Sequence, residues 1–337
     1  MNPQTATNQP RRPDDPGREL WLRQRRQGIG ASDAAAILGV HPYKTAFDVW
    51  LEKTGQVKDR PPTKPMEWGL RLEDAIAQKY SDETGRKLWK PDRIYRHPEH
   101  DFICCTPDRL VIGENGVPTM GLELKTADSH VEWKWGELGT DDVPREYIVQ
   151  CAASMAVLGF DQWDVAVLIG GNDDRIYTIR RDSGFERLLI SRLSEWWERY
   201  VVKDEMPPTD HGDLATAWLY ERHPEKGPRI NADEHAQTVG DRLVRVKREI
   251  KELEVTETSL RNQLIFACGD AAGIDGHGWR ALWCGGNKKS ETNWQQLATA
   301  LMSRLNALGH GEEINTMAAA ARFDKETARS FRFMADK

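Results

Sequence analysis

Apolar residues up to residue 205 recur at two different intervals, and these intervals predict helices and strands. Several segments have apolar residues at intervals of three and four, which is the period of a helix. These segments repeatedly end at glycine, which favours the backbone conformation that closes a helix. The predicted helices cover residues 18–27, 32–39, 43–54, 66–84, 144–158 and 184–202. Alternating or continuous apolar runs bounded by turn residues predict strands. The predicted strands cover residues 87–94, 102–105, 108–112, 119–126, 161–171 and 173–182.

The order of these elements predicts an α/β core: helices, a meander of strands, a further helix and two more strands. We expect this core to occupy residues 18–205, after a polar, proline-containing leader at 1–17 that we expect to be disordered. Composition changes near residue 205, which predicts a linker over 206–228. A smaller, mainly helical module is predicted over 229–337.

The predicted C-terminal module begins with a long heptad pattern. Apolar residues follow one another at alternating intervals of four and three, interrupted by Glu257. They are Val239, Leu243, Val246, Ile250, Leu253, Leu260 and Leu264. This pattern predicts a helical hairpin or a self-association element. We expect a small β-hairpin and a terminal helical segment after it, over residues 273–297.

Composition narrows the class of protein. No run of about 18 apolar residues exists, so the sequence contains no predicted membrane span. The five cysteines include no C-x-x-C pair, which favours reduced thiols and a cytoplasmic location over a metal site. The net charge of −6 argues mildly against a general coat for nucleic acid. An enzyme that acts on nucleic acid stays compatible with this charge, because a basic lining can be local.

The last strand of the predicted meander carries two opposite charges on one face. Because side chains alternate along a strand, Glu123 and Lys125 share that face, whereas the apolar residues between them point the other way. A hairpin before this strand would bring Asp108, which follows Pro107, back beside them. One interpretation is an ion pair on an exposed sheet face, which contributes little to stability. The other is a site that needs both charges.

A third carboxylate, Glu73, stands on an apolar face of the helix predicted over 66–84. The residues three and four positions away from it are Gly69, Leu70, Ile76 and Ala77. A carboxylate on such a face turns inward and needs a cation. That cation is either an arginine or a metal ion shared with Asp108 and Glu123, and the sequence leaves both open.

Three carboxylates beside a lysine suit metal-assisted phosphodiester hydrolysis. Mg²⁺ takes oxygen ligands and keeps several waters, and such a cation acidifies water and neutralises charge on the phosphate. Lys125 would orient the attacking water or balance charge at the phosphate. The pattern therefore predicts a Mg²⁺ site for cutting nucleic acid.

Pro107–Asp108 followed by Glu123–Leu124–Lys125 resembles the PD-(D/E)XK nuclease signature. Five stretches between residues 18 and 205 follow the order and spacing of the YqaJ-type viral recombinases, which are similar to phage lambda exonuclease. The stretches are GIGASDAAAILGVHPYKTAFDVWLEKTG, WGLRLEDAIAQKY, CTPDRL, LELKT and VPREYIVQCAASMAVLGFDQWDVAVLIGG. The resemblance implies an α/β PD-(D/E)XK core, in which helices flank a mixed central sheet.

The activity implied by this resemblance is an exonuclease that resects duplex DNA from the 5′ end and leaves a 3′ single strand for annealing. The implied cofactor is Mg²⁺, for which Mn²⁺ is a possible substitute. The implied metal ligands are Asp108, Glu123 and the backbone carbonyl of Leu124, with Glu73 completing the acidic cluster. Lys125 would serve the attacking water, and Gln150 would reach the catalytic centre. For Gln150, the alternative is a solvated polar stripe on its helix.

The resemblance also implies a 5′-phosphate pocket formed by Arg25 and Ser32. The residues themselves support such a pocket, because Arg25 and Arg26 lie in a basic stretch and Ser32 lies at a predicted helix N-terminus. The alternative is that Ser32 only caps its helix. Two tryptophans, Trp133 and Trp135, follow the strand that carries the lysine, and we expect them either to line the DNA path or to pack in the core.

The partners implied by the resemblance are double-stranded DNA ends and a single-strand annealing protein. It further implies that copies of the chain form a ring, commonly a trimer. It also implies that the protein is encoded by a phage or prophage and acts in a bacterial host cell. Two other functions stay open. One is an endonuclease with the same metal site, structure-selective or sequence-independent, and the other is a catalytically weak module that binds DNA ends. The complete set of charged residues speaks against the weak module.

Overall fold

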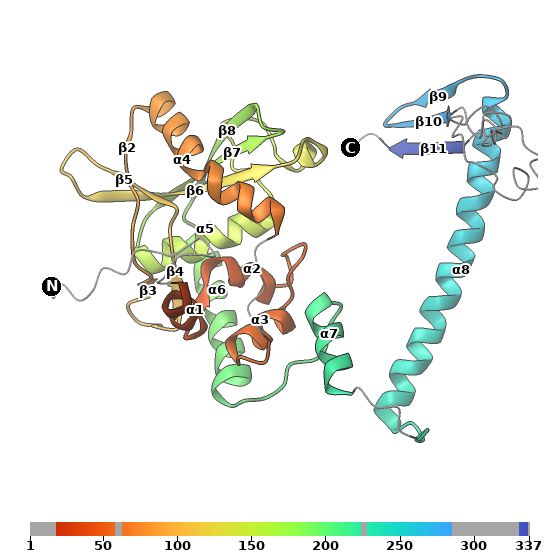
Figure 1. Ribbon diagram of the computed structural model, residues 1–337, viewed down its shortest axis with the longest axis horizontal. Coiled ribbons are helices and arrows are strands. Elements are labelled where there is room, and N and C mark those ends of the chain that lie inside the picture. Colours follow the sequence, from red (N-terminus) through yellow and green to blue (C-terminus); the bar gives the residue numbers. More distant parts are fainter. Residues whose placement is uncertain (1–17, 58–62, 224–227, 285–329, 336–337) are drawn as a thin grey trace, which may run out of the picture. The chain divides into compact units, whose positions relative to one another are not determined.

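The computed structural model describes residues 18–57, 63–223, 228–284 and 330–335 (Figure 1). The chain divides into two units, residues 1–227 and 228–337. The predicted leader and the predicted terminal helical segment lie outside the described residues. None of the described helices combines the length and the apolar character needed to cross a membrane.

A five-stranded mixed sheet forms the centre of the first unit. In order across the sheet, its strands are β2 (Lys87–Trp89), β5 (Arg109–Ile112), β6 (Pro118–Ala127), β7 (Gln162–Ile169) and β8 (Asp173–Arg180). β6 and β7 pair in parallel, and the other neighbours pair antiparallel. A parallel pair needs a crossover connection, which here contains the helix α5 (Arg145–Leu158). The predicted α/β class, with a mixed sheet flanked by helices, is confirmed.

The two faces of β6 pack differently, as the alternation along this strand predicts. Leu122 and Leu124 pack beneath α4 (Lys64–Thr84) in a buried apolar cluster. Full burial of Leu122, which is 0% exposed, stabilises the fold by about 1.5–3 kcal/mol. On the opposite face, a Cβ on Gly121 would lie 2.3 Å from the indole of Trp163, so only glycine fits there. Glu123 and Lys125 share this second face with Gly121.

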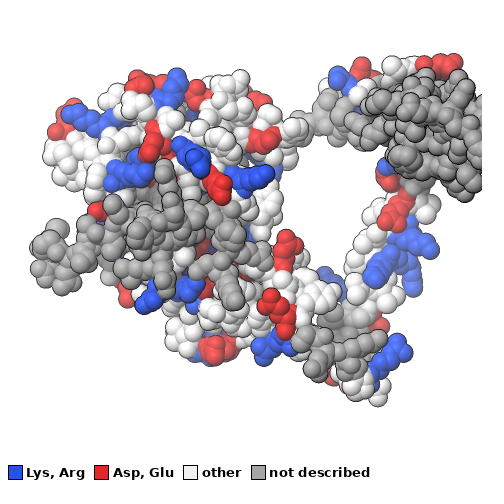
Figure 2. Space-filling model, viewed as in Figure 1, with Lys and Arg blue, Asp and Glu red and all other residues white. Residues whose placement is uncertain are grey.

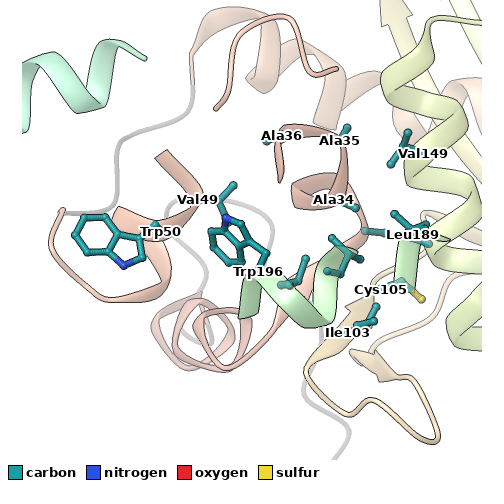
Figure 3. Packing of buried hydrophobic residues seen from close by; sticks show 14 of the residues in the cluster. Ala34, Ala35, Ala36, Val49, Trp50, Ile103, Cys105, Val149, Leu189 and Trp196 are labelled. Carbon is teal, nitrogen blue, oxygen red and sulfur yellow. The ribbon is translucent and has the colours of Figure 1, made fainter. Parts of the chain in front are cut away.

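A cluster of helices and a small second sheet pack around α5. The elements are α1 (Arg18–Arg26), α2 (Ala31–Ile37), α3 (Ala46–Lys53) and α6 (Ser183–Trp197), with the strands β1 (Ile29–Gly30), β4 (Ile103–Cys105) and β3 (Tyr95–Arg96). Ala34 and Ala35 of α2 are buried in this core, with Val149 of α5 and Leu189 of α6 nearby (Figure 3). Because alanine side chains are small, α2 and α5 can approach closely, and this contact brings the N-terminal segment to the central sheet.

Three sequence predictions need correction in this unit. The predicted linker contains a helix, α7 (Asp213–Arg222), whose Trp218 packs against the rings of Phe47 and Trp50. The strand predicted over 87–94 ends at Trp89, because Pro91 follows closely and offers no backbone N–H to a sheet. Pro144 is the residue before α5 and not part of its first turn.

The described residues of the second unit, 228–284 and 330–335, form one long helix and three strands. The helix α8 runs without a break from Glu234 to Cys268, so the whole heptad pattern lies on a single helix. The strands are β9 (Gly273–Gly276), β10 (Trp279–Cys284) and β11 (Ser330–Ala335), with β10 in the centre of an antiparallel sheet. The predicted hairpin is confirmed as β9 and β10, whereas β11 was not predicted. Figure 2 shows Lys and Arg side chains grouped along part of α8.

Candidate active site

The predicted hairpin brings Asp108 to the middle of β6. Asp108 directly precedes β5, and β5 pairs antiparallel with β6 so that Arg109 lies opposite Leu122. The carboxylate of Asp108 accepts a hydrogen bond from the backbone N–H of Leu124, with Oδ2 and N 2.9 Å apart. The carboxylate is therefore held next to the strand segment that carries Glu123 and Lys125.

Glu123, Lys125 and Gln150 form one hydrogen-bonded group. Glu123 is 4% exposed, so its partnership with Lys125 is not the exposed surface ion pair that the sequence left open. Its Oε1 lies 2.6 Å from the ammonium of Lys125 and 2.5 Å from Nε2 of Gln150. The ammonium also lies 3.4 Å from Oε1 of Gln150. Gln150, on α5, thus faces the sheet, and the interpretation of a solvated polar stripe is wrong for this residue.

The environment keeps Lys125 protonated. Burial alone would lower the pKa of Lys125, but the carboxylates of Glu123 and Asp108 outweigh burial and raise this pKa above its ordinary value. The ammonium also lies 4.9 Å from the ring centre of Tyr147, a cation–π contact. Sequence reasoning missed Tyr147. The available signal was its position three residues before Gln150, on the same face of α5.

Glu73 is buried on α4 and lies near an arginine. Nη1 of Arg109 is 4.0 Å from Oε2 of Glu73. The same guanidinium donates to the backbone carbonyl of Asp108 over 2.6 Å and forms an ion pair with Asp74. The arginine partner that the sequence left open for Glu73 is therefore present, and Arg109 connects Glu73 to the residue preceding β5. Arg109 was itself missed, although it directly follows the Pro107–Asp108 pair.

The predicted convergence of three carboxylates on one ion is not found in the part of the chain that the structure describes. There, no group of three or more His, Cys, Asp or Glu side chains is arranged to hold a metal ion. Glu73 lies by Arg109, and Glu123 lies by Lys125. The oxygens of Asp108 and Glu123, on neighbouring segments of the sheet, still fit Mg²⁺, which often uses one or two carboxylates and completes its shell with water and phosphate. The ligand roles of Glu73 and of the Leu124 carbonyl stay predictions.

A small pocket beside the hydrogen-bonded group of Glu123, Lys125 and Gln150 contains Arg25 and Ser32. Gln150 also lines the pocket, and the cavity volume is about 30 Å³. The other lining residues are Gly30, Ala31, Ile94, Cys104, Cys105, Thr106 and Ser154. The structure thus brings the two residues predicted for a 5′-phosphate next to a residue that contacts Glu123 and Lys125. Arg26, also predicted for this role, is not among the described residues that line the pocket.

Ser32 does not cap its helix. The residue before α2 is Gly30, whose N–H donates to Oδ2 of Asp33 over 3.1 Å. Ser32 is the second residue of α2 and is exposed. The interpretation that Ser32 acts only as a helix cap is therefore wrong, because Asp33 supplies the capping carboxylate in its place.

Buried Asp33 also anchors the pocket through two ion pairs. Its carboxylate lies 2.9 Å from the ammonium of Lys44 and 2.7 Å from that of Lys53, and Asp33 is 1% exposed. Burial alone would raise the pKa of Asp33, but Lys44, Lys53 and Arg25 outweigh burial and hold this pKa well below its usual range. Lys53 further donates to the backbone carbonyl of Arg25 over 3.0 Å. Sequence reasoning missed this anchor, because its lysines are distant in sequence.

The two tryptophans after β6 have different environments. Trp133 lies in a short 3-10 helix, η1 (Ser129–Lys134), and is 57% exposed. Trp135 is buried and stacks on Tyr147, with ring centres 5.5 Å apart. Trp135 is therefore a core residue, and the prediction that it lines a DNA path is wrong. For Trp133, contact with DNA stays a prediction.

Comparison with known proteins places this chain in a family. A family model described as the YqaJ-like viral recombinase domain matches residues 20–161. The uncharacterized protein YqaJ of Bacillus subtilis (strain 168) is 32% identical over 272 residues, which cover 79% of this chain and 83% of YqaJ.

Solved structures similar to this chain include two exonucleases. An alkaline exonuclease (LHK-Exo) from Laribacter hongkongensis is 18% identical, with a TM-score of 0.43 over 61% of this chain and 97% of that chain. A phage-related exonuclease from Haemophilus somnus 129PT is 14% identical, with a TM-score of 0.40 over 53% of this chain and 96% of that chain. The matched domain and the extent of identity to the Bacillus protein show that this chain belongs to the YqaJ-like viral recombinase family.

Proposed function

We propose that this protein is a Mg²⁺-dependent deoxyribonuclease that resects duplex DNA from 5′-phosphorylated ends and leaves 3′ single strands. The observation that carries the proposal is the position of Gln150. This residue lines the pocket of Arg25 and Ser32 and also donates a hydrogen bond to Glu123. Glu123 forms a charged group with Lys125 on β6 and with Asp108, just before β5. A DNA end bound in the pocket would therefore lie beside the charged group.

Asp108 and Glu123 are the residues that we propose to hold the cation. When bound, Mg²⁺ neutralises charge on the phosphate and favours the loss of a proton from water. The protein contributes the position of the carboxylates. Asp108 is fixed by the N–H of Leu124, and Glu123 by the amide of Gln150. In this proposal Glu73 acts through Arg109, which bonds the backbone of Asp108.

Lys125 is proposed to donate a hydrogen bond at the reacting phosphate. Its raised pKa means that it carries its proton at neutral pH, so it can hold an attacking water or a phosphate oxygen in place. Gln150 and the ring of Tyr147 restrict where the ammonium can go. A hydrogen-bond donor with few accessible positions loses little entropy when the substrate arrives.

Arg25 and Ser32 are proposed to bind the terminal 5′-phosphate. Arginine presents a planar set of donors that suits phosphate oxygens, and a serine hydroxyl adds another donor. The end of α1 that carries Arg25 is held by Lys53, which in turn is paired with buried Asp33. These contacts hold the backbone at Arg25 before DNA arrives, and the guanidinium itself lies 4.8 Å from the ring centre of Trp21.

The test is a digestion of three DNA substrates by the full chain with Mg²⁺. The substrates are a linear duplex with 5′-phosphates, the same duplex with 5′-hydroxyls and a closed circle. The expected result is fast loss of the 5′-phosphorylated strands, slower loss of the hydroxyl ends and an intact circle. A Lys125→Met variant serves as the control for contaminating nucleases and should be inactive.

The other outcomes reject specific parts of the proposal. Cutting of the closed circle would show an endonuclease that uses the same charged group. Equal rates on phosphorylated and hydroxyl ends would reject the role of Arg25 and Ser32. No cutting with either Mg²⁺ or Mn²⁺ would leave a protein that binds DNA ends. In this proposal, the 3′ single strand would be taken up by a protein that anneals single strands.

A further inference from the structure

Helix α8 exposes an apolar stripe along most of its length. The stripe occupies the positions that repeat every three and four residues, the core positions of a coiled coil. The exposed fractions are 53% for Val239, 54% for Leu243, 40% for Val246, 49% for Ile250, 67% for Leu253 and 56% for Leu260. Of the residues of α8, all of which the structure describes, only Cys268 is buried. A helix of this kind normally depends on a partner that covers its apolar face.

We infer that α8 pairs with α8 of a second copy of this chain in an antiparallel coiled coil. A repeat of 3.5 residues fits the packing of one such helix on another, because each core side chain then enters a gap between four residues of the facing helix. When two copies are aligned about the midpoint of the stripe, every core position has a partner. Ile250 then faces Leu253 of the second copy, and Leu243 faces Leu260 of the second copy.

Glu257 decides the direction of the pairing. This glutamate interrupts the apolar stripe at a core position. In a parallel pair in register, it would face Glu257 of the second copy, which would bury two like charges together. In the antiparallel pair it faces Val246 of the second copy, and its partner in the same helix, Arg261, stays beside it at the edge of the core.

The charges that flank the stripe favour the same direction. In a parallel coiled coil, Arg242 would face Lys247 of the second copy and Glu249 would face Glu254 of the second copy, which are two like-charge contacts. In an antiparallel pair, Lys247 and Glu254 of the second copy lie along the same edge of the interface. The antiparallel pair therefore replaces repulsion with attraction, and charge pattern and core pattern agree.

The first test measures the mass of the full chain in solution over a range of protein concentrations. Leu253→Glu places a charge in both central layers of the proposed pair, and we expect it to raise the concentration for half-association about tenfold or more. Val255→Glu is the matched control, because Val255 is 65% exposed on the same helix but lies off the stripe. This control should associate like the wild type. Circular dichroism of both variants would check that α8 remains helical.

The second test determines direction by disulfide formation. One sample carries Leu243→Cys and another carries Leu260→Cys. The antiparallel pair predicts a cross-linked dimer under mild oxidation when the two variants are mixed, and little in either sample alone. The wild type under the same conditions controls for the native thiols.

Three results would overturn the inference. A wild type that stays monomeric at every concentration would show that the stripe is covered within the chain or by a different protein. Association that Leu253→Glu and Val255→Glu change equally would place the contact elsewhere. Cross-linking of each variant with itself would indicate a parallel pair. None of these readouts depends on nuclease activity, so the inference can fail while the proposed function stands.

Discussion

The candidate active site has two parts that the chain assembles in different ways. The charged group of Asp108, Glu123 and Lys125 lies on β6 and at the residue directly before β5, where the pairing of backbone groups sets the positions of the side chains. The pocket of Arg25 and Ser32 combines separate helices, and the ion pairs of buried Asp33 hold it together. Gln150 belongs to both parts.

In the proposed function, this difference divides the work. The charged group would supply the carboxylates and the protonated lysine for cutting. The pocket would supply the donors for a terminal phosphate. Substitutions in one part should therefore leave the other part working, and this separation is open to direct test.

Asp108→Asn should produce the largest effect. Asparagine keeps an oxygen that can accept the N–H of Leu124, but it removes the negative charge that we propose to hold the cation. We expect the rate of cutting to fall roughly 100-fold or more with all linear substrates, because a cation contributes several kcal/mol to this chemistry. Binding to 5′-phosphorylated ends should stay as in the wild type, as a DNA-binding titration would show. Full activity in Mg²⁺ would falsify the proposed cutting centre.

Arg25→Ala should remove the preference for phosphorylated ends. The loss of charged hydrogen bonds to the phosphate predicts a fall of roughly 10- to 100-fold in cutting at low concentrations of 5′-phosphorylated DNA. The rate on 5′-hydroxyl ends should change little. Arg26→Ala is the control, because Arg26 adjoins Arg25 but does not line the pocket. An equal loss in both variants would mean that general attraction of DNA, not a phosphate pocket, explains the effect.

Gln150→Ala should affect both parts at once. The amide contacts Glu123 and Lys125 and lines the pocket, so its removal loosens the lysine and alters the wall of the pocket. We expect about a tenfold fall in cutting and a smaller preference for phosphorylated ends, measured with the same three DNA substrates. A change in only one of these two properties would show that Gln150 does not join the two parts.

His41 should make the stability of the folded protein sensitive to acid. This is the smallest effect among the four predictions. Its Nδ1 accepts the N–H groups of Tyr43 and Lys44 at 3.1 and 2.9 Å, which needs a neutral ring. Burial, with help from Lys44, lowers the pKa of His41 below 6.5. A lowered pKa in the folded state stabilises the protein above about pH 6.5, and this contribution is lost as the pH falls through the folded-state pKa.

His41→Asn removes this titration, so its stability should fall less than that of the wild type between pH 7.5 and pH 5. Thermal unfolding at a series of pH values would measure the difference. His235→Asn is the control, because His235 is exposed in the first turn of α8. A wild type and a His41→Asn variant with the same pH dependence would remove His41 from the account.

The two parts of the site also differ in how far the sequence predicted them. Alternation along β6 was enough to place Glu123 and Lys125 on one face, because a strand has a fixed period and a short hairpin allows few alternatives. The residues that pair with the site residues from other elements were harder to predict. Arg109 beside Glu73 depends on how a helix packs against a strand, and Lys53 beside Asp33 depends on how two helices pack together. No local pattern encodes either contact.

Other errors have similar physical causes. Trp133 and Trp135 are two residues apart and look alike in sequence, but only Trp135 has Tyr147 and Tyr177 to pack against. The helix α7 was missed because it directly follows the polar, proline-containing stretch KDEMPPTDHG, and its burial depends on Trp218 reaching aromatic rings far away in the chain. In both cases a tertiary contact decides the environment of a tryptophan.

A crystal structure of the Asp108→Asn variant with Mg²⁺ and a 5′-phosphorylated duplex end would test the two-part site most directly. The account predicts that the terminal phosphate contacts Arg25 and Ser32 and that the adjacent phosphodiester lies beside Glu123 and Lys125. A terminal phosphate bound away from Arg25 and Ser32, with an internal phosphodiester at Glu123, would contradict it.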